Sequence, residues 1–366
     1  MDSQLEVSPD ALRQFDGSAS AFFLVTDAEL ADTFTLADSH YEQAAIVAIR
    51  DGENLGKLIG DLPDGSAVLV AAPRSFVRST DLAELGERKL AVMPCGSTPV
   101  QPDHVRYFLK VIERTDPVAQ AERAEKFFDA VANADDLRLV DETQHTECAF
   151  DAGGDEYIWN QQAGLLEPGE HQIAPAGELS VLPMEITDFD PSRRLALNGS
   201  LTLRGEPIVH AGYDPVLADP QAELYGKLAA LRRHPVVVDV EGGLIIDCRP
   251  GTRTPESIRA AAVLNGLLAS DPRYRAVWEL GFGINTGMSL VAANCGLNEV
   301  YGGTNGVVHL GIGLTPFTQF ALTFLCPGSR LVDGTGTTLL GTEADQAADG
   351  ARCRIRRTKE ASCGCH

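Results

Sequence analysis

The segment AFFLVTDAELADTFTLADSHYEQAAIVAIR, residues 21–50, begins and ends with apolar runs and is polar between them. Similar apolar runs follow at 66–72 and 89–95. Fully apolar strands separated by helices are typical of a parallel sheet that is covered on both faces. We therefore predict strands at these runs, helices between them, and an N-terminal parallel α/β domain over residues 1–137. No phosphate-binding glycine-rich loop follows the first strand, which argues against a nucleotide site there.

Helical signals appear in two later segments. Apolar residues recur at helical spacing through residues 103–135, where Asp116-Pro117 is typical of the start of a second helix. A further helix is predicted at 255–269, where Pro255 stands at the first position and Thr254 serves as N-cap.

The sequence pattern changes at about residue 138. Short strand-like runs now alternate with turn signals such as Gly-Gly and Asn-Gly. We expect a strand-rich α+β domain over residues 138–350. The last residues, 351–366, are basic in an otherwise acidic chain and contain three cysteines, so we treat them as a separate tail.

Composition excludes several classes of partner. The chain has 366 residues and a net charge of −22, which repels nucleic acid and anionic membrane surfaces. No apolar run reaches the roughly 20 residues that a membrane helix requires.

The N-terminus has no secretory pattern, and the eight cysteines are scattered. We therefore expect a cytoplasmic protein whose thiols are mostly reduced.

Three glycine-bounded apolar segments carry ionisable side chains. Burying an isolated carboxylate is costly, but a metal ion satisfies carboxylate and imidazole ligands and removes that cost. Small neighbouring residues let the backbone, a metal and a substrate approach closely. The segments are PAGELSVLP (175–183), WELGFGIN (278–285) and NEVYGGTNGVVHLGIG (298–313). Their candidate ligands are Glu178, Glu279, Glu299 and His309.

The order of these motifs resembles the aminopeptidase T family of metallopeptidases, family M29. The resemblance lies in Pro-x-Gly-Glu near a strand, then Glu-Leu-Gly-x-Gly-x-Asn, then a glutamate followed by Gly-Thr and His-x-x-x-Gly. It covers roughly residues 155–345, and the α/β first third is compatible with the N-terminal domain of that family. By resemblance we expect a homodimer and a peptide substrate or ligand.

The resemblance also implies roles for the four residues. In that family, paired divalent cations polarise a peptide carbonyl and activate a water molecule. Carried over by motif, Glu178, Glu279, Glu299 and His309 match metal ligands for zinc, manganese or cobalt. Glu279 and Glu299 are also the candidate catalytic residues, with Glu299 as a further ligand or as the general base.

One part of the family pattern is missing. The family supplies two further ligands from a downstream His-x-Asp motif, whereas the corresponding segment here, LTPFTQFALTFLCPG, has neither residue type. The site would then hold one ion or none, and His210 or His366 is the candidate replacement ligand. The same gap argues against the ring-cleaving dioxygenases related to that family.

Two functions from different classes follow. The first is a metal-dependent peptide hydrolase that a chelator would inactivate. The second is a degenerate peptidase that has kept its cleft and lost its chemistry. Such a protein would bind a peptide during maturation of a ribosomally made natural product.

Overall fold

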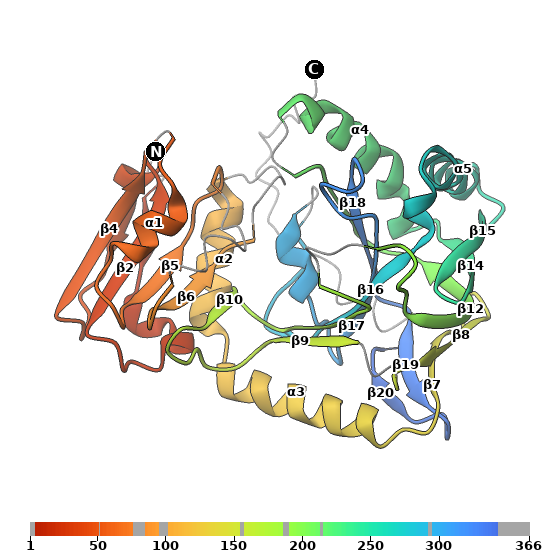
Figure 1. Ribbon diagram of the computed structural model, residues 1–366, viewed down its shortest axis with the longest axis horizontal. Helices are drawn as coiled ribbons and strands as arrows, with labels where there is room; N and C mark the ends of the chain where they lie inside the picture. Colours follow the sequence, from red (N-terminus) through yellow and green to blue (C-terminus); the bar gives the residue numbers. More distant parts are fainter. Residues whose placement is uncertain are drawn as a thin grey trace, which may run out of the picture.

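The computed structural model describes residues 4–50, 52–75, 85–94, 102–153, 157–185, 190–212, 215–291 and 295–342. The chain has a mixed α/β fold, with a parallel sheet at one end and antiparallel sheets at the other (Figure 1). The predicted tail at 351–366 lies outside the described residues. Among the described residues, no helix is long and apolar enough to cross a bilayer.

The four predicted strands of the first third form one parallel sheet. Its order is β10-β6-β5-β2-β4, so β10 (His171–Ile173) joins it from far along the chain. The four predicted strands are β2 (Ala21–Asp27), β4 (Gln43–Ile49), β5 (Ala67–Val70) and β6 (Lys89–Val92). Helix α1 (Leu55–Gly60) packs with one face, and α2 (Pro102–Arg114) packs with the other. The prediction of a sheet covered on both faces is therefore confirmed.

The helix expected between β2 and β4 does not form. The chain makes a short 3-10 turn, η3 (Ala31–Thr33), and then β3 (Phe34–Leu36). Strand β3 pairs in parallel with β1 (Leu5–Val7), and this pairing buries Phe34 beneath the parallel sheet. Tertiary burial of an apolar side chain thus outweighs the helix-compatible composition of the segment. Most of the helix-compatible segment before β6 lies outside the described residues.

Two helices connect the parallel sheet to the rest of the molecule. After α2, the chain turns at Asp116 and enters α3 (Pro117–Ala132). The Asp116 carboxylate accepts hydrogen bonds from the backbone N–H groups of Val118 and Ala119, which confirms the predicted helix start. Figure 1 shows α3 running along the lower edge of the view, from the parallel sheet to the antiparallel sheets.

The remaining strands form two antiparallel sheets. The six-stranded sheet has the order β13-β18-β17-β16-β11-β9, and the seven-stranded sheet has the order β15-β14-β12-β8-β7-β19-β20. The first consists of β9 (Ile158–Gln162), β11 (Glu178–Leu182), β13 (Pro207–His210), β16 (Val277–Gly283), β17 (Val307–Ile312) and β18 (Ala321–Cys326). The second consists of β7 (Leu137–Asp141), β8 (Thr146–Asp151), β12 (Ala196–Leu203), β14 (Val236–Glu241), β15 (Leu244–Pro250), β19 (Arg330–Asp333) and β20 (Thr338–Leu340).

Two helices pack with the antiparallel sheets, and short 3-10 turns occur along the chain. Helix α5 (Pro255–Ser270) begins as predicted, since the Thr254 hydroxyl accepts a hydrogen bond from the N–H of Ser257. Helix α4 (Ala218–Leu228) was not predicted. The short turns are η1 (Pro9–Ala11), η2 (Arg13–Phe15), η6 (Pro215–Leu217), η7 (Ala229–Arg232), η8 (Pro272–Arg275) and η9 (Gly296–Val300).

The six-stranded sheet has two chemically different faces. Alternate residues of its strands enter the largest apolar cluster, which also contains residues of the seven-stranded sheet, α3, α4 and α5. Those residues include Leu179, Val181, Leu280, Phe282, Val308, Leu310, Leu322 and Phe324. Because side chains alternate along a strand, the residues between them project from the opposite face. That opposite face, called the site face below, carries Glu178, Glu279 and His309.

Candidate functional site

Three of the four predicted ligands come together on the site face. Glu178 begins β11, Glu279 lies in β16 and His309 lies in β17, and these strands are neighbours in the sheet. One potential ligand atom from each residue lies within 4.8 Å of the others. Donors that share one tetrahedral ion at about 2.0–2.2 Å lie roughly 3.3–3.6 Å apart, so these side chains would have to close by up to about 1 Å to hold one. The cluster is therefore a candidate site for a single cation.

Each of these side chains faces a glycine on the next strand. Glu178 pairs with Gly283, Glu279 with Gly311, and His309 with Gly281. A Cβ atom on Gly281 would lie 1.8 Å from Nε2 of His309, and one on Gly311 would lie 2.7 Å from Oε2 of Glu279. The glycines in these motifs thus provide the space that the ionisable side chains occupy.

His309 has an unusual environment for a buried imidazole. Its side chain is 0% exposed, and neither ring nitrogen has a hydrogen-bond partner among the described residues. Its Nε2 lies 3.4 Å from Oε1 of Glu178, close enough for an ion pair. A buried polar atom without a partner is destabilising and often marks a bound ion or water. A cation between His309 and the two glutamates would satisfy one of these nitrogens.

The carboxylates of the cluster repel one another. Burial raises the pKa of Glu279 to about 8, and the charge of Glu178 contributes. Burial also raises the pKa of Glu299 to about 8, with further contributions from Glu178 and Glu279. Like charges held together in a poorly solvated place favour protonation, and a bound cation would reverse that preference.

Glu299 stands beside the three donors rather than among them. It lies in η9, and its carboxylate hydrogen-bonds to the side chain of Thr323 on β18. The three-donor group does not include it. Its influence on the cluster is therefore electrostatic in this structure.

The loop before Glu178 is held by residues that the motif search did not assign. Gly177, with φ of +106°, donates its N–H to the carbonyl of Gln162 and accepts from the N–H of Ile284. The carbonyl of Ala176 accepts from the amide of Asn285 at 2.9 Å and from that of Gln120 at 3.1 Å. Asn285 is the last residue of the quoted Glu-Leu-Gly-x-Gly-x-Asn motif, so the signal was present in the sequence.

Strand β18, in the segment that follows His309, brings few donors to the site face. The residues of β18 that share the site face are Ala321, Thr323 and Leu325, of which only Thr323 is polar. His210, on β13, pairs with Ala321 of β18 and so lies two strands from β17 and four residues along from the level of His309. At ordinary strand spacing and rise this places it roughly 16 Å from His309. It does not join the donor group, and burial lowers its pKa to about 4. His366 lies outside the described residues.

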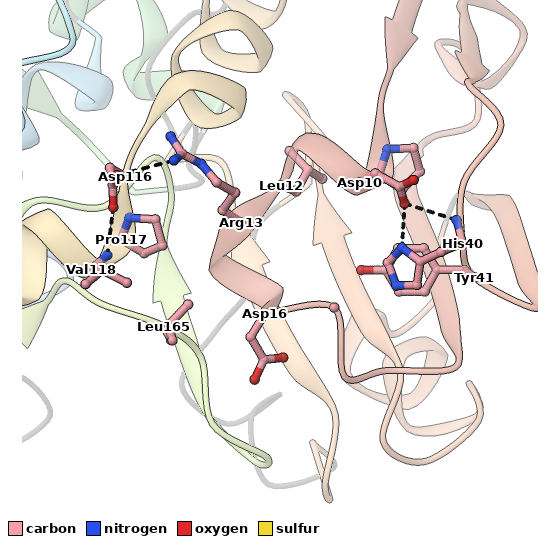
Figure 2. Close-up of a pocket in the computed structure, with 12 residues that line it drawn as sticks. Asp10, Leu12, Arg13, Asp16, His40, Tyr41, Asp116, Pro117, Val118 and Leu165 are labelled. Atoms are coloured by element: carbon pink, nitrogen blue, oxygen red, sulfur yellow. Dashed lines mark hydrogen bonds and ion pairs between the residues drawn. The ribbon is translucent and has the colours of Figure 1, made fainter.

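A separate cavity of about 460 Å³ lies elsewhere in the molecule. Figure 2 shows it between η1 and η2 on one side and the start of α3 on the other. Its carboxylates already have partners: Asp10 contacts His40 at 2.7 Å, Asp16 contacts Lys89 at 2.9 Å, and Asp116 contacts Arg13 at 3.3 Å. None of the predicted ligands lines this cavity, so we do not place the candidate chemistry there.

The comparisons with known proteins identify the family. Residues 51–330 match the family described as crocagin biosynthetic protein CgnE/B. The chain belongs to this family. The resemblance to aminopeptidase T stays a prediction, because the matched CgnE/B family is a different one. No curated protein matches the chain.

A solved structure supports the fold of this CgnE/B family member. The chain is similar to 2,5-dihydroxypyridine dioxygenase from Pseudomonas putida KT2440, with a TM-score of 0.53. The match covers 92% of this chain and 95% of that one, at 12% sequence identity. At so low an identity the likeness concerns the fold alone. It extends over both the parallel and the antiparallel parts.

Proposed function

We propose that this chain binds the precursor peptide of a crocagin-type product at the site face of its six-stranded sheet. Crocagin is a ribosomally made peptide natural product, so its biosynthetic proteins act on or alongside a precursor peptide. Family membership supports a peptide as the ligand. The place of binding rests on one observation, the convergence of Glu178, Glu279 and His309 on that face.

A divalent cation, zinc, manganese or cobalt, fits this convergence. The donor set of two carboxylates and one imidazole suits such ions, and the unpartnered nitrogens of His309 leave a ligand position to fill. Glu178, Glu279 and His309 would hold the ion. When bound, it would polarise a peptide carbonyl oxygen as a Lewis acid. The residues of this chain would then orient the peptide around that contact.

Binding without turnover is favoured by the residues around the donors. The site-facing positions of β18 offer Ala321, Thr323 and Leu325 in place of further strong ligands. A paired-ion site needs more donors than the described residues gather here. We therefore favour the function in which the chain binds the peptide without cleaving it.

Peptide hydrolysis is the second candidate, and Glu299 is the observation that favours it. Its carboxylate lies close enough to Glu178 and Glu279 for their charges to raise its pKa. A cation bound nearby would lower that pKa again, and the ionised carboxylate beside the donors could then accept a proton from an attacking water. In that reading Glu279 is a ligand and Glu299 the general base.

One experiment separates the two candidates. Zinc-loaded protein is mixed with the synthetic precursor peptide, and binding is followed by calorimetry while the peptide is followed by mass spectrometry. We expect stoichiometric binding and an intact peptide. Cleavage that stops with EDTA and in Glu279→Gln would establish the hydrolase instead. If the peptide binds neither the zinc-loaded protein nor the protein in EDTA, both candidates are contradicted.

The homodimer stays a prediction that follows from the resemblance. Light scattering on the purified full-length chain would measure its mass directly, and a mass twice that of the 39.1 kDa chain is expected.

A further inference from the structure

A small apolar cluster lies apart from the main core. It consists of buried Leu182, Trp278 and Leu314, with the half-buried Ile158 and Phe317 packed against them. The strand register places two of these residues on the site face. Leu182 is four residues after Glu178 in β11 and pairs with Ile158 of β9. Side chains at even spacing share a face, so both project from the same side as Glu178.

Trp278 reaches the same side through an irregularity in β16. The pairing with β17 shifts between Val277 and Glu279, so that Trp278 and Glu279 together oppose Gly311. A Cβ atom on Gly311 would lie 2.7 Å from the Glu279 carboxylate and 3.4 Å from the Trp278 ring. The indole and a candidate ligand are therefore neighbours over one glycine.

The indole ring is held in place by a hydrogen bond. Its Nε1–H donates to the carbonyl of Gly313 at 2.7 Å. Trp278 is 9% exposed, whereas the cluster edge formed by Ile158 and Phe317 is only half-buried. The polar group of the ring is thus satisfied internally, and the apolar part of the cluster lies beside the donors.

We propose that this cluster is a subsite for an apolar side chain of the bound peptide, either aromatic or branched aliphatic. The inference rests on the proposed function, because the peptide must meet the donors of the site face. A backbone carbonyl at Glu178, Glu279 and His309 would place a neighbouring side chain beside Trp278, against the half-buried edge formed by Ile158 and Phe317. Such a subsite would select the peptide by hydrophobic burial, while the donors would fix its backbone.

Amino-acid hydroxamates test this inference without knowledge of the natural peptide. The hydroxamate group chelates a bound metal, and the side chain then samples the surface next to it. Zinc-loaded protein is titrated with the hydroxamates of L-phenylalanine, L-leucine and L-serine. We expect the first two to bind about tenfold or more tighter than the serine compound, as burial of a large apolar side chain predicts.

Variants locate the effect in the cluster. Trp278→Ala should bring the phenylalanine-to-serine ratio below about threefold while zinc content stays unchanged. Phe317→Ser at the half-buried edge gives a second, milder variant should Trp278→Ala fold poorly. Trp159→Phe is the matched control, because Trp159 packs against Phe127 and Phe128 of α3. It should leave the ratio unchanged.

A readout without metal keeps the two proposals distinguishable. The chain has two tryptophans, so in Trp159→Phe the fluorescence comes from Trp278 alone. N-acetyl-L-phenylalaninamide should shift this emission in metal-free protein, whereas N-acetyl-L-serinamide should not. If zinc binds but all hydroxamates bind equally and the emission is unmoved, the subsite is wrong and the metal site stands. If no zinc binds but the emission shifts, the subsite stands and the cation is wrong.

Discussion

At the scale of single residues, the site depends on glycines whose lack of a side chain leaves room for the ionisable groups. The imidazole of His309 and the carboxylate of Glu279 occupy the volume that side chains on Gly281 and Gly311 would fill. Sequence alone indicated that small residues surround the ionisable groups. It could not show that each ligand faces a glycine across a strand boundary, because that fact depends on the register.

Gly281→Ala should remove the cation site. The new methyl group would overlap the His309 ring, which must leave the donor cluster for the protein to fold. We expect zinc binding to fall by at least tenfold and thermal stability to fall as well. Gly266→Ala is the control, since Gly266 lies in α5 with no atom within 4 Å of a new Cβ. That change should be neutral or stabilising by about 0.5–1 kcal/mol. Equal zinc affinity in both variants would contradict the assigned geometry.

The metal-free protein should lose stability as pH rises. The pKa of Glu279 is about 8 in the folded chain, against an ordinary value of 4.5. Between those values the unfolded chain releases the proton and the folded chain keeps it, so ionisation progressively favours unfolding. In EDTA, Glu279→Gln should therefore melt several degrees above wild type at pH 8 and close to it at pH 5. Melting curves that respond to pH in the same way for both proteins would argue against a desolvated carboxyl at this position. Exposed Glu42→Gln serves as the control.

At the scale of elements, local patterns predicted those strands and helices whose signals are self-contained. The four apolar strands of the parallel sheet form as predicted, as do helices α3 and α5 with their N-caps at Asp116 and Thr254. Strand β3 was missed because it is stabilised by pairing with β1, which lies almost thirty residues earlier in the sequence. Helix α4 was missed because its sequence is only weakly amphipathic. It is stabilised by packing against β13, and a local sequence pattern does not reveal that contact.

The loop that presents Glu178 gives a prediction at this scale. Asn285 and Gln120 both donate to the carbonyl of Ala176, two residues before Glu178. Asn285→Ala should leave this buried carbonyl less satisfied, at a cost of about 1–3 kcal/mol. Zinc affinity should also fall, because Glu178 loses its fixed position. Asn133→Ala, at the exposed end of α3, is the control. It should change the free energy of unfolding by no more than about 1 kcal/mol and leave zinc affinity unchanged. Zinc affinity unchanged in Asn285→Ala would mean that this amide does not position Glu178.

At the scale of the whole molecule, the site face lies between two apolar regions. Val307 and Leu325, at one end of that face, join the cluster that contains residues of α2 and the parallel sheet. Leu182, Trp278 and Leu314 lie at the other end. Three of the four residues that the motifs marked, Glu178, Glu279 and His309, converge. The motifs did not predict that Glu299 would stand to one side, or that an apolar cluster would adjoin the donors.

Cobalt-loaded protein provides the most direct test of the account. The visible absorption of Co²⁺ reports its coordination, so one titration asks whether the ion is bound and whether the peptide reaches it. We predict stoichiometric cobalt uptake that is lost in Glu279→Gln, and a change in the spectrum when the precursor peptide is added to wild type. Peptide binding that leaves the cobalt spectrum unchanged would place the peptide elsewhere. A wild-type protein that takes up no cobalt would contradict the cation site itself.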